Sequence, residues 1–292
     1  MAQNYKYNKA EILKAAKSGQ PIRYRSLYVY PLTVNDYELL WGCEPALTIR
    51  LSTLPVVYAI KSYSEALFAI AVAGENVVVN GEVVARPSDW VRFLSLLCAS
   101  CRIPLNAMRA SIGFNVDNQD KTKLRSMSIR QLAENEEISE LLSVEDLNNL
   151  RQIIAEMNGR KLPDESENAE LAQAEIDIRT SGTTTLDFSL DSLLASVARD
   201  QRVRIRDLYE WTIYEFELIR AAIERERKFT VFGIGENSGM VKFPKGNPYP
   251  SIFFDKPAGQ QAVIDASEFT SRISGAVQAT DKLPDNLPVI TK

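Results

Sequence analysis

The stretch of sequence that decides the fold is RDLYEWTIYEFELIRAAIERERK, which runs from Arg206 to Lys228. Its large apolar side chains recur every three or four residues, as they do on one face of an α-helix. This apolar stripe consists of Tyr209, Ile213, Phe216, Ile219 and Ile223. We expect the strongest helix of the chain here, and therefore a core that is built mainly from helices.

Basic residues surround the same helix and leave two interpretations open. Aromatic side chains lie among them, a combination that RNA or an acidic protein surface could bind. The basic residues are Arg202, Arg204, Arg206, Arg220, Arg225, Arg227 and Lys228. The acidic residues that nearly neutralise them are Asp207, Glu210, Glu215, Glu217, Glu224 and Glu226. We therefore favour an ordinary amphipathic helix with salt bridges on its solvated face.

Helical spacing also recurs in the first half of the chain. A short amphipathic helix is expected at 10–17, and a longer helical region at 47–73 that Pro55 breaks or kinks. Thr33, with Asp36 three residues later, forms a capping-box pattern that begins another helix.

Two more helix starts follow. Ser88 is expected to cap a helix that carries several large apolar residues. Ser143 and Asp146 repeat the capping-box pattern and open a helix that should end at Asn158-Gly159.

Short β-hairpins are predicted between these helices. The segment from Pro21 to Pro31 is rich in strand-forming side chains and is expected to be extended. Asn80-Gly81, between two β-branched runs, is the typical two-residue hairpin turn. Residues 113–129 alternate around a polar turn and predict a second hairpin. The expected fold class is thus mainly α with small β-hairpins, an α+β protein with a helical core and a polar, flexible C-terminal tail.

The composition along the chain suggests two halves. Residues 1–160 are expected to form an N-terminal helical domain, and the acidic stretch 161–185 a linker or surface helix. Residues 186–257 would form a C-terminal helical domain that ends in a loop rich in glycine, proline and aromatic residues, and 258–292 a flexible tail. We expect turns at Gly233 and Gly235 in that loop.

The absence of histidine from all 292 residues argues against most enzyme classes. It removes Ser-His-Asp and Cys-His nucleophile activation and the common general base near neutral pH. Neighbouring acids such as Glu136-Glu137 give no sign of a raised pKa. We therefore predict no catalytic residues.

No cofactor or metal site is predicted either. Cys98 and Cys101 form a CxxC motif, but with Cys43 they make three thiols, one fewer than a Cys₄ zinc site requires. Buried free cysteines are the favoured interpretation. The glycines from Gly233 to Gly239 imitate a dinucleotide loop with the wrong spacing, and no GxxxxGK[ST] phosphate loop occurs.

Charge and hydropathy also restrict the partners. The net charge is −4 and no block of basic residues stands out, which disfavours nucleic-acid binding. No uncharged run reaches the roughly 20 residues that a membrane span requires, and the N-terminus lacks the apolar core of a secretory signal. We expect a protein that stays in the cytosol of the cell that makes it.

Two segments near the C-terminus carry a resemblance to a known group of proteins. They are Leu208-Tyr-Glu-Trp-Thr-Ile-Tyr-Glu-Phe216 and Gly246-Asn-Pro-Tyr-Pro-Ser251, the latter followed by Phe253-Phe254-Asp255. They resemble proteins of tailed bacteriophages and prophages, and the tail assembly chaperones most of all. This resemblance implies a small helical fold and a location in the host cytoplasm.

The resemblance implies a tail morphogenesis protein that binds tail components, such as the tape-measure or tail-tube protein, during assembly. The alternative is a structural virion component of the tail or baseplate, and either could form a homo-oligomer. An amphipathic client helix could pack on the apolar stripe and the aromatic loop. The partner-binding residues that we predict are Tyr209, Trp211, Ile213, Phe216, Ile219, Tyr249 and Phe253.

Overall fold

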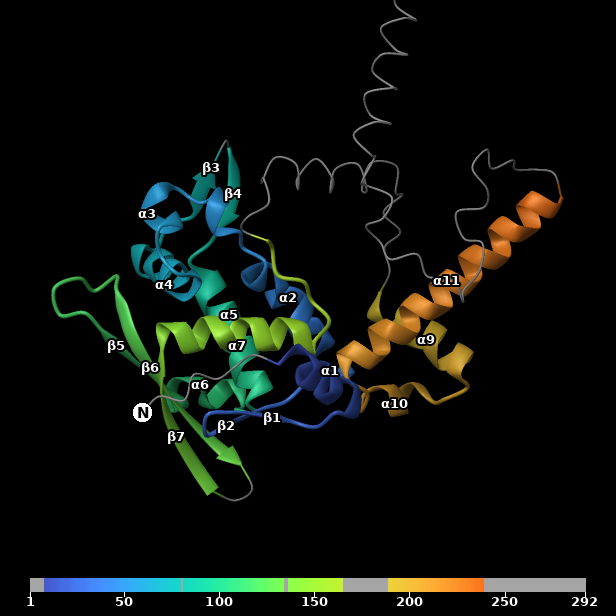
Figure 1. Cartoon of the computed structure of the whole chain (residues 1–292), viewed down its shortest axis with the longest axis horizontal. Coiled ribbons are helices and arrows are strands. Elements are labelled where there is room, and N and C mark those ends of the chain that lie inside the picture. Colours follow the sequence, from blue (N-terminus) through green and yellow to red (C-terminus); the bar gives the residue numbers. More distant parts are fainter. Residues whose placement is uncertain (1–7, 80, 134–135, 165–188, 239–292) are drawn as a thin grey trace, which may run out of the picture. The chain divides into compact units, whose positions relative to one another are not determined.

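The computed structural model of the chain describes residues 8–79, 81–133, 136–164 and 189–238 (Figure 1). The chain divides into two compact units, residues 1–223 and 224–292. The described part of the second unit, residues 224–238, includes the C-terminal end of helix α11 (Ile213–Asn237). The other described elements belong to the first unit.

Helices form most of the first unit, as expected. Their bounds are α1 (Lys9–Ser18), α2 (Tyr37–Leu47), α3 (Val56–Ala59), α4 (Tyr63–Ala73), α5 (Ser88–Ser100), α6 (Met108–Ser111), α7 (Val144–Met157), α9 (Leu190–Gln201) and α10 (Ile205–Leu208). Short 3₁₀ turns occur at η1 (Val34–Asp36), η2 (Leu51–Thr53) and η3 (Leu105–Ala107). Pro55 interrupts the region 47–73 as predicted, since it directly precedes α3.

Small antiparallel sheets complete the α+β fold. The two-stranded pairs are β1 (Ile22–Tyr24) with β2 (Leu27–Val29), and β3 (Val77–Val79) with β4 (Glu82–Ala85). The third sheet has the order β5 (Ile112–Val116), β6 (Leu124–Ala133) and β7 (Glu136–Ser143). The two predicted hairpins, at Asn80-Gly81 and within 113–129, are therefore confirmed, and the pairing of β1 with β2 and strand β7 are additional.

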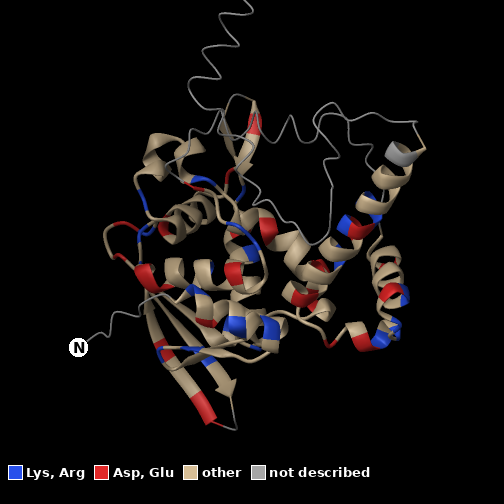
Figure 2. Ribbon diagram, turned by 45° about the vertical axis from the view of Figure 1, so that its right-hand side comes forward, with Lys and Arg blue, Asp and Glu red and all other residues tan. Residues whose placement is uncertain are grey.

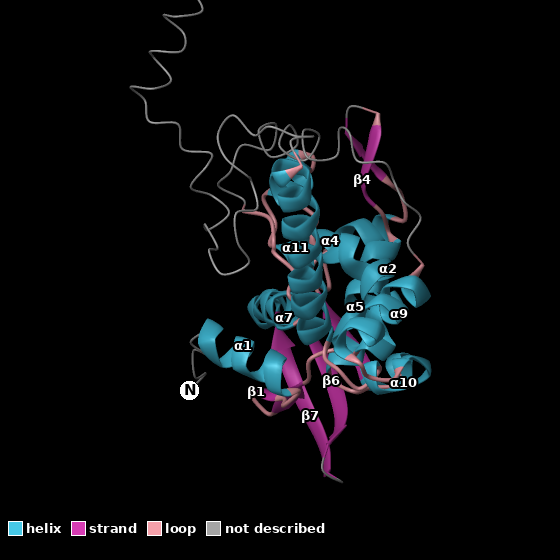
Figure 3. Ribbon diagram, turned by 90° about the vertical axis from the view of Figure 1, so that its right-hand side faces the viewer, coloured by secondary structure: helices cyan, strands magenta, loops and turns pink. Residues whose placement is uncertain are grey.

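Helix α7 lies at the centre of the first unit (Figure 1). It packs against α1, α4 and α5, and β6 and β7 lie beside it (Figure 3). Its inward side chains are fully buried, and they include Leu147, Leu150, Ile153 and Ile154. This single helix thus brings the N-terminal helices and the three-stranded sheet into one core.

The predicted capping box at the start of α7 also makes tertiary contacts. The Ser143 hydroxyl accepts a hydrogen bond from the Asp146 N–H (3.2 Å), and the Asp146 carboxylate accepts one from the Ser143 N–H (2.8 Å). The same carboxylate accepts a hydrogen bond from the Tyr24 hydroxyl (2.8 Å) and pairs with Arg25 (2.9 Å). The cap therefore fixes the β1–β2 turn to α7.

The stretch from Arg206 to Lys228 is not one helix, which corrects our expectation. Residues 209–212 separate α10 from α11, because the backbone around them forms hydrogen bonds with the N-terminal region. The Ile213 N–H donates to the Leu32 carbonyl (2.9 Å), and the Val34 N–H donates to the Trp211 carbonyl (2.9 Å). The Thr212 hydroxyl donates to the Ala16 carbonyl (2.7 Å). These long-range hydrogen bonds outweigh the local helical preference.

The turns expected at Gly233 and Gly235 are also wrong, because both residues lie inside α11. A glycine inside a helix costs about 1 kcal/mol relative to alanine, which the rest of a long helix can offset. The other glycines and prolines of the predicted loop lie outside the described residues.

Residues 190–223 contribute to the core of the first unit. Leu194, Leu208, Ile213 and Phe216 are fully buried in the same apolar cluster as the N-terminal helices. The described structure therefore places its division between compact units after Ile223, whereas we expected a separate domain to begin at residue 186. Of the acidic stretch 161–185, residues 161–164 are described.

Candidate functional site

Two of the predicted partner-binding residues are core residues. Ile213 and Phe216 have no exposed surface. The Phe216 ring packs edge-to-face on Tyr37, with 5.9 Å between ring centroids. A partner cannot reach either side chain unless α11 leaves the core, which corrects their assignment as contact residues.

The other predicted residues lie at different depths. Trp211 and Ile219 are half-buried against the same core. Tyr209, between α10 and α11, is 37% exposed and is the most accessible of the set that the structure describes. Tyr249 and Phe253 lie outside the described residues. The structure therefore does not gather the described members of the set into one surface.

Polar side chains form a hydrogen-bonded network at the edge of this core. The Tyr37 hydroxyl donates to Glu217, and burial together with this bond raises the pKa of Tyr37 to about 12. Glu217 also accepts a hydrogen bond from Arg220 (2.7 Å), and Arg160 pairs with Glu44 (3.2 Å). Each charged group has an opposite charge beside it, so this network holds α11 to α2 and offers no free reactive group. Figure 2 shows basic and acidic residues interspersed along α11, as a salt-bridged helix requires.

The three thiols are buried and free, as predicted. Burial raises the pKa of Cys98 to about 11 and that of Cys101 to about 12, and it also raises the pKa of Cys43. These thiols therefore stay protonated near neutral pH, where the thiolate is the reactive form.

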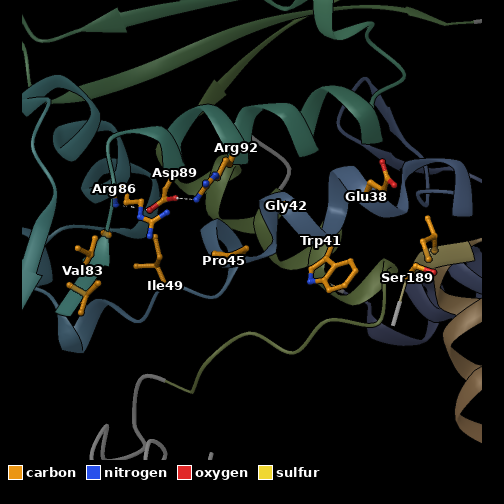
Figure 4. Close-up of a pocket in the computed structure, with 13 residues that line it drawn as sticks. Glu38, Trp41, Gly42, Pro45, Ile49, Val83, Arg86, Asp89, Arg92 and Ser189 are labelled. Carbon is orange, nitrogen blue, oxygen red and sulfur yellow. Dashed lines mark hydrogen bonds and ion pairs between the residues drawn. The ribbon is translucent and has the colours of Figure 1, made fainter. Parts of the chain in front are cut away.

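The described residues contain an open groove with a volume of about 760 Å³ (Figure 4). It is bounded by the outer face of α2, by β4, by the start of α5 and by the start of α9. Its lining residues are Glu38, Trp41, Gly42, Pro45, Ile49, Val83, Val84, Ala85, Arg86, Asp89, Arg92, Ser189 and Leu190. All of them belong to the first unit.

The outer face of α2 forms the floor of the groove. Glu38, Trp41, Gly42 and Pro45 follow one another at the i, i+3, i+4 and i+7 spacing that places side chains on one helical face. All four are exposed, and Trp41 has 57% of its surface accessible. The opposite face of α2 is buried, so the helix presents a separate apolar strip to solvent.

A charged cluster closes one end of the groove. The Asp89 carboxylate accepts hydrogen bonds from the Arg86 backbone N–H (2.7 Å) and from the Arg92 guanidinium (2.9 Å; Figure 4). Ser88, which we predicted to be the cap, is instead the first residue of α5, and that helix has no side-chain cap; Asp89 bonds to the N–H of Arg86, which precedes the helix. With two arginines and one carboxylate, this end is positive, whereas Glu38 makes the other end negative.

Sequence reasoning missed this groove because the helix predicted after Thr33 and Asp36 does not show which of its faces stays exposed. The sequence Trp41-Gly-Cys-Glu-Pro45 nevertheless contains a signal of an unusual helical face. Glycine and proline are the two residue types least suited to a helix interior, yet both occur there within one turn of a tryptophan. Such residues on an exposed helical face indicate that this face serves a purpose other than stabilising the helix.

No family model, curated protein or solved structure matches the chain. Within the described residues, no group of three or more Cys, Asp or Glu side chains is arranged to hold a metal ion. No helix in the described part of the chain has the length and apolar character needed to cross a membrane.

Proposed function

We propose that this chain binds other proteins during the assembly of a phage tail, in the manner of a tail assembly chaperone. The observation that carries the proposal is the open groove over which Trp41 lies exposed. A groove with an apolar lining gains free energy when a partner's apolar side chain is buried in it. Tryptophan is enriched among the residues that dominate the energy of protein interfaces. The phage setting rests on the sequence resemblance alone.

The chemistry of the groove favours binding over catalysis. Its two carboxylates do not form a catalytic pair. Glu38 is exposed at one end, whereas Asp89 at the other end is hydrogen-bonded to Arg92 and to the Arg86 N–H. The hydroxyl among the lining residues is that of Ser189, and it bonds within its own helix, to the Ser192 N–H (3.3 Å) and the Ser192 hydroxyl (3.0 Å). The apolar lining, in contrast, gains free energy when another protein covers it.

A structural role in the tail or baseplate is the second candidate. Two exposed leucines on the outward face of the third sheet favour it, because both lie apart from the groove; in the strand register Arg130 and Ser139 lie between them. Leu132 is 75% exposed and Leu141 is 59% exposed. A subunit that is permanently packed in a particle would cover such side chains.

The two candidates differ in where the chain is found. The experiment is mass spectrometry of purified tails or phage particles, together with a pull-down from an infected-cell lysate that uses the full chain as bait. Capture of a tape-measure or tube protein, with the chain absent from particles, would support the assembly role. A stoichiometric amount in particles would support the structural role, and absence from both samples would contradict the phage setting.

Replacing Trp41 with alanine is expected to reduce capture of the tail partner at least tenfold. The free energy of unfolding should change by less than about 0.5 kcal/mol, because the side chain is mostly exposed. The matched control is Leu105→Ala, which removes a side chain of similar exposure (48%) outside the groove. Equal capture by both variants would show that the groove is not the binding site.

A further inference from the structure

The two ends of the groove carry opposite charges, and this difference defines the partner more closely. The inference rests on the proposed function. We infer that the groove receives an amphipathic helix, which packs its apolar stripe across Gly42. Its acidic end lies over Arg86 and Arg92, and its basic end lies over Glu38. The partner is thus a helix with opposite charges at its two ends.

Gly42 is the first observation that supports a helical occupant. A Cβ atom built on Gly42 would meet no atom of the described residues within 4 Å, so nothing in that part of the chain requires glycine at this position. Glycine nevertheless weakens α2, in whose interior it lies. Its absent side chain lowers the floor of the groove between Trp41 and Pro45, and small residues allow two helices to approach closely.

Pro45 supports the same conclusion. It has no N–H and so cannot donate the helical hydrogen bond to the Trp41 carbonyl four residues earlier. Proline therefore weakens helix α2, and it does so on the same exposed face on which Gly42 lies. Two destabilising residues and an exposed tryptophan within one turn have a common explanation if this face is covered by a partner.

The length of the exposed strip matches a helix. From Glu38 to Pro45 the strip extends for about 10 Å along α2, which is roughly two helical turns. Ile49 and Val83 extend the apolar lining toward the positive end. A partner helix with apolar residues at i, i+3, i+4 and i+7 would cover this strip along its whole length.

Charge complementarity sets the orientation. Asp89 neutralises one of the two arginines at the β4–α5 end, which leaves that end with one net positive charge. Glu38, near Ser189 at the opposite end, is exposed (Figure 4). An acidic group on the partner is therefore favoured at the arginine end and a basic group at the Glu38 end.

The test uses a synthetic 14-residue helical peptide with leucines at i, i+3, i+4, i+7 and i+11, lysines at its N-terminus and glutamates at its C-terminus. A photoreactive group is placed beside the glutamates. Binding to the full chain is followed by fluorescence anisotropy, and the cross-linked residues are mapped by mass spectrometry. We expect cross-links at residues 83–86 and none at Ser189 or Leu190.

Gly42→Leu is the decisive variant. It should fill the groove and weaken peptide binding at least tenfold, while the melting temperature stays level or rises, because leucine favours the helix. Gly42→Ala is the matched control and should keep most of the binding. The double variant Glu38→Lys, Arg86→Glu should move the cross-links to the Ser189 end.

Three results would overturn the inference. They are no saturable peptide binding, equal binding by Gly42→Leu, or equal binding of a peptide of the same length and charge in which central prolines prevent helix formation. These outcomes are separate from those of the lysate experiment. A peptide that fails while Trp41→Ala still reduces capture from lysate would reject the helical occupant and leave the proposed function standing. Peptide binding without capture of a tail partner from lysate would keep the helical occupant and reject the proposed function.

Discussion

Phe216→Ala is expected to lower the free energy of unfolding by about 3–5 kcal/mol, the usual effect of truncating a fully buried phenylalanine. The ring has no exposed surface, and its edge-to-face contact with Tyr37 joins α11 to α2. Truncation removes apolar burial and leaves a cavity at this junction. Denaturant unfolding followed by circular dichroism measures the loss.

Leu218→Ala on the same helix is the matched control, because Leu218 is 53% exposed. Its free energy of unfolding should stay within about 0.5 kcal/mol of the unmodified chain. If Phe216→Ala kept full stability and yet lost partner binding, Phe216 would be a contact residue and its burial in the core would be contradicted.

Arg151→Met is expected to lower the free energy of unfolding by about 3 kcal/mol, because it removes the donors of two buried carbonyl groups. The guanidinium of Arg151 donates to the Leu47 carbonyl (2.9 and 2.6 Å) and to the Ile49 carbonyl (3.1 Å). It also lies 3.6 Å from the centre of the Tyr63 ring, and Tyr63 is itself buried. This arginine therefore satisfies the C-terminal end of α2 and fixes α7 to it.

Arg151→Lys separates charge from geometry. Lysine keeps the charge but lacks the planar set of donors, so it should restore less than half of the lost stability. Arg125→Met is the matched control, since Arg125 forms an exposed pair with Asp117 and its loss should cost less than about 1 kcal/mol. Both comparisons use denaturant unfolding. Equal stability of Arg151→Met and the unmodified chain would show that water replaces the arginine at α2.

The elements that the sequence predicts well are those whose signals are local. The capping boxes at Thr33 and Ser143 form as predicted, because a side chain and a backbone group three residues apart determine them. The hairpin at Asn80-Gly81 likewise depends on two turn residues, and its flanking strands pair as expected. Long-range contacts are not needed to recognise such features.

The errors arise where distant residues decide the structure. The break before α11 depends on hydrogen bonds between residues 32–34 and 211–213, which no local pattern shows. Strand β7 carries several glutamates and reads as a polar surface, yet it pairs with β6 along its whole length. The site was misplaced for the same reason, because a helical stripe does not say which surface will cover it. Ile213 and Phe216 face the core, whereas Trp41 faces solvent.

The isolated bridge between Thr33 and Thr212 has a consequence for the order of events during synthesis. Its two partners are separated by most of the first unit, and ribosomes add on the order of 5–20 residues each second. The nascent chain therefore waits on the order of 10–40 s between the emergence of the first partner and that of the second. Throughout that interval Tyr37 lacks the ring of Phe216 that later packs on it, so the growing polypeptide passes through a stage in which α11 is still missing from the core.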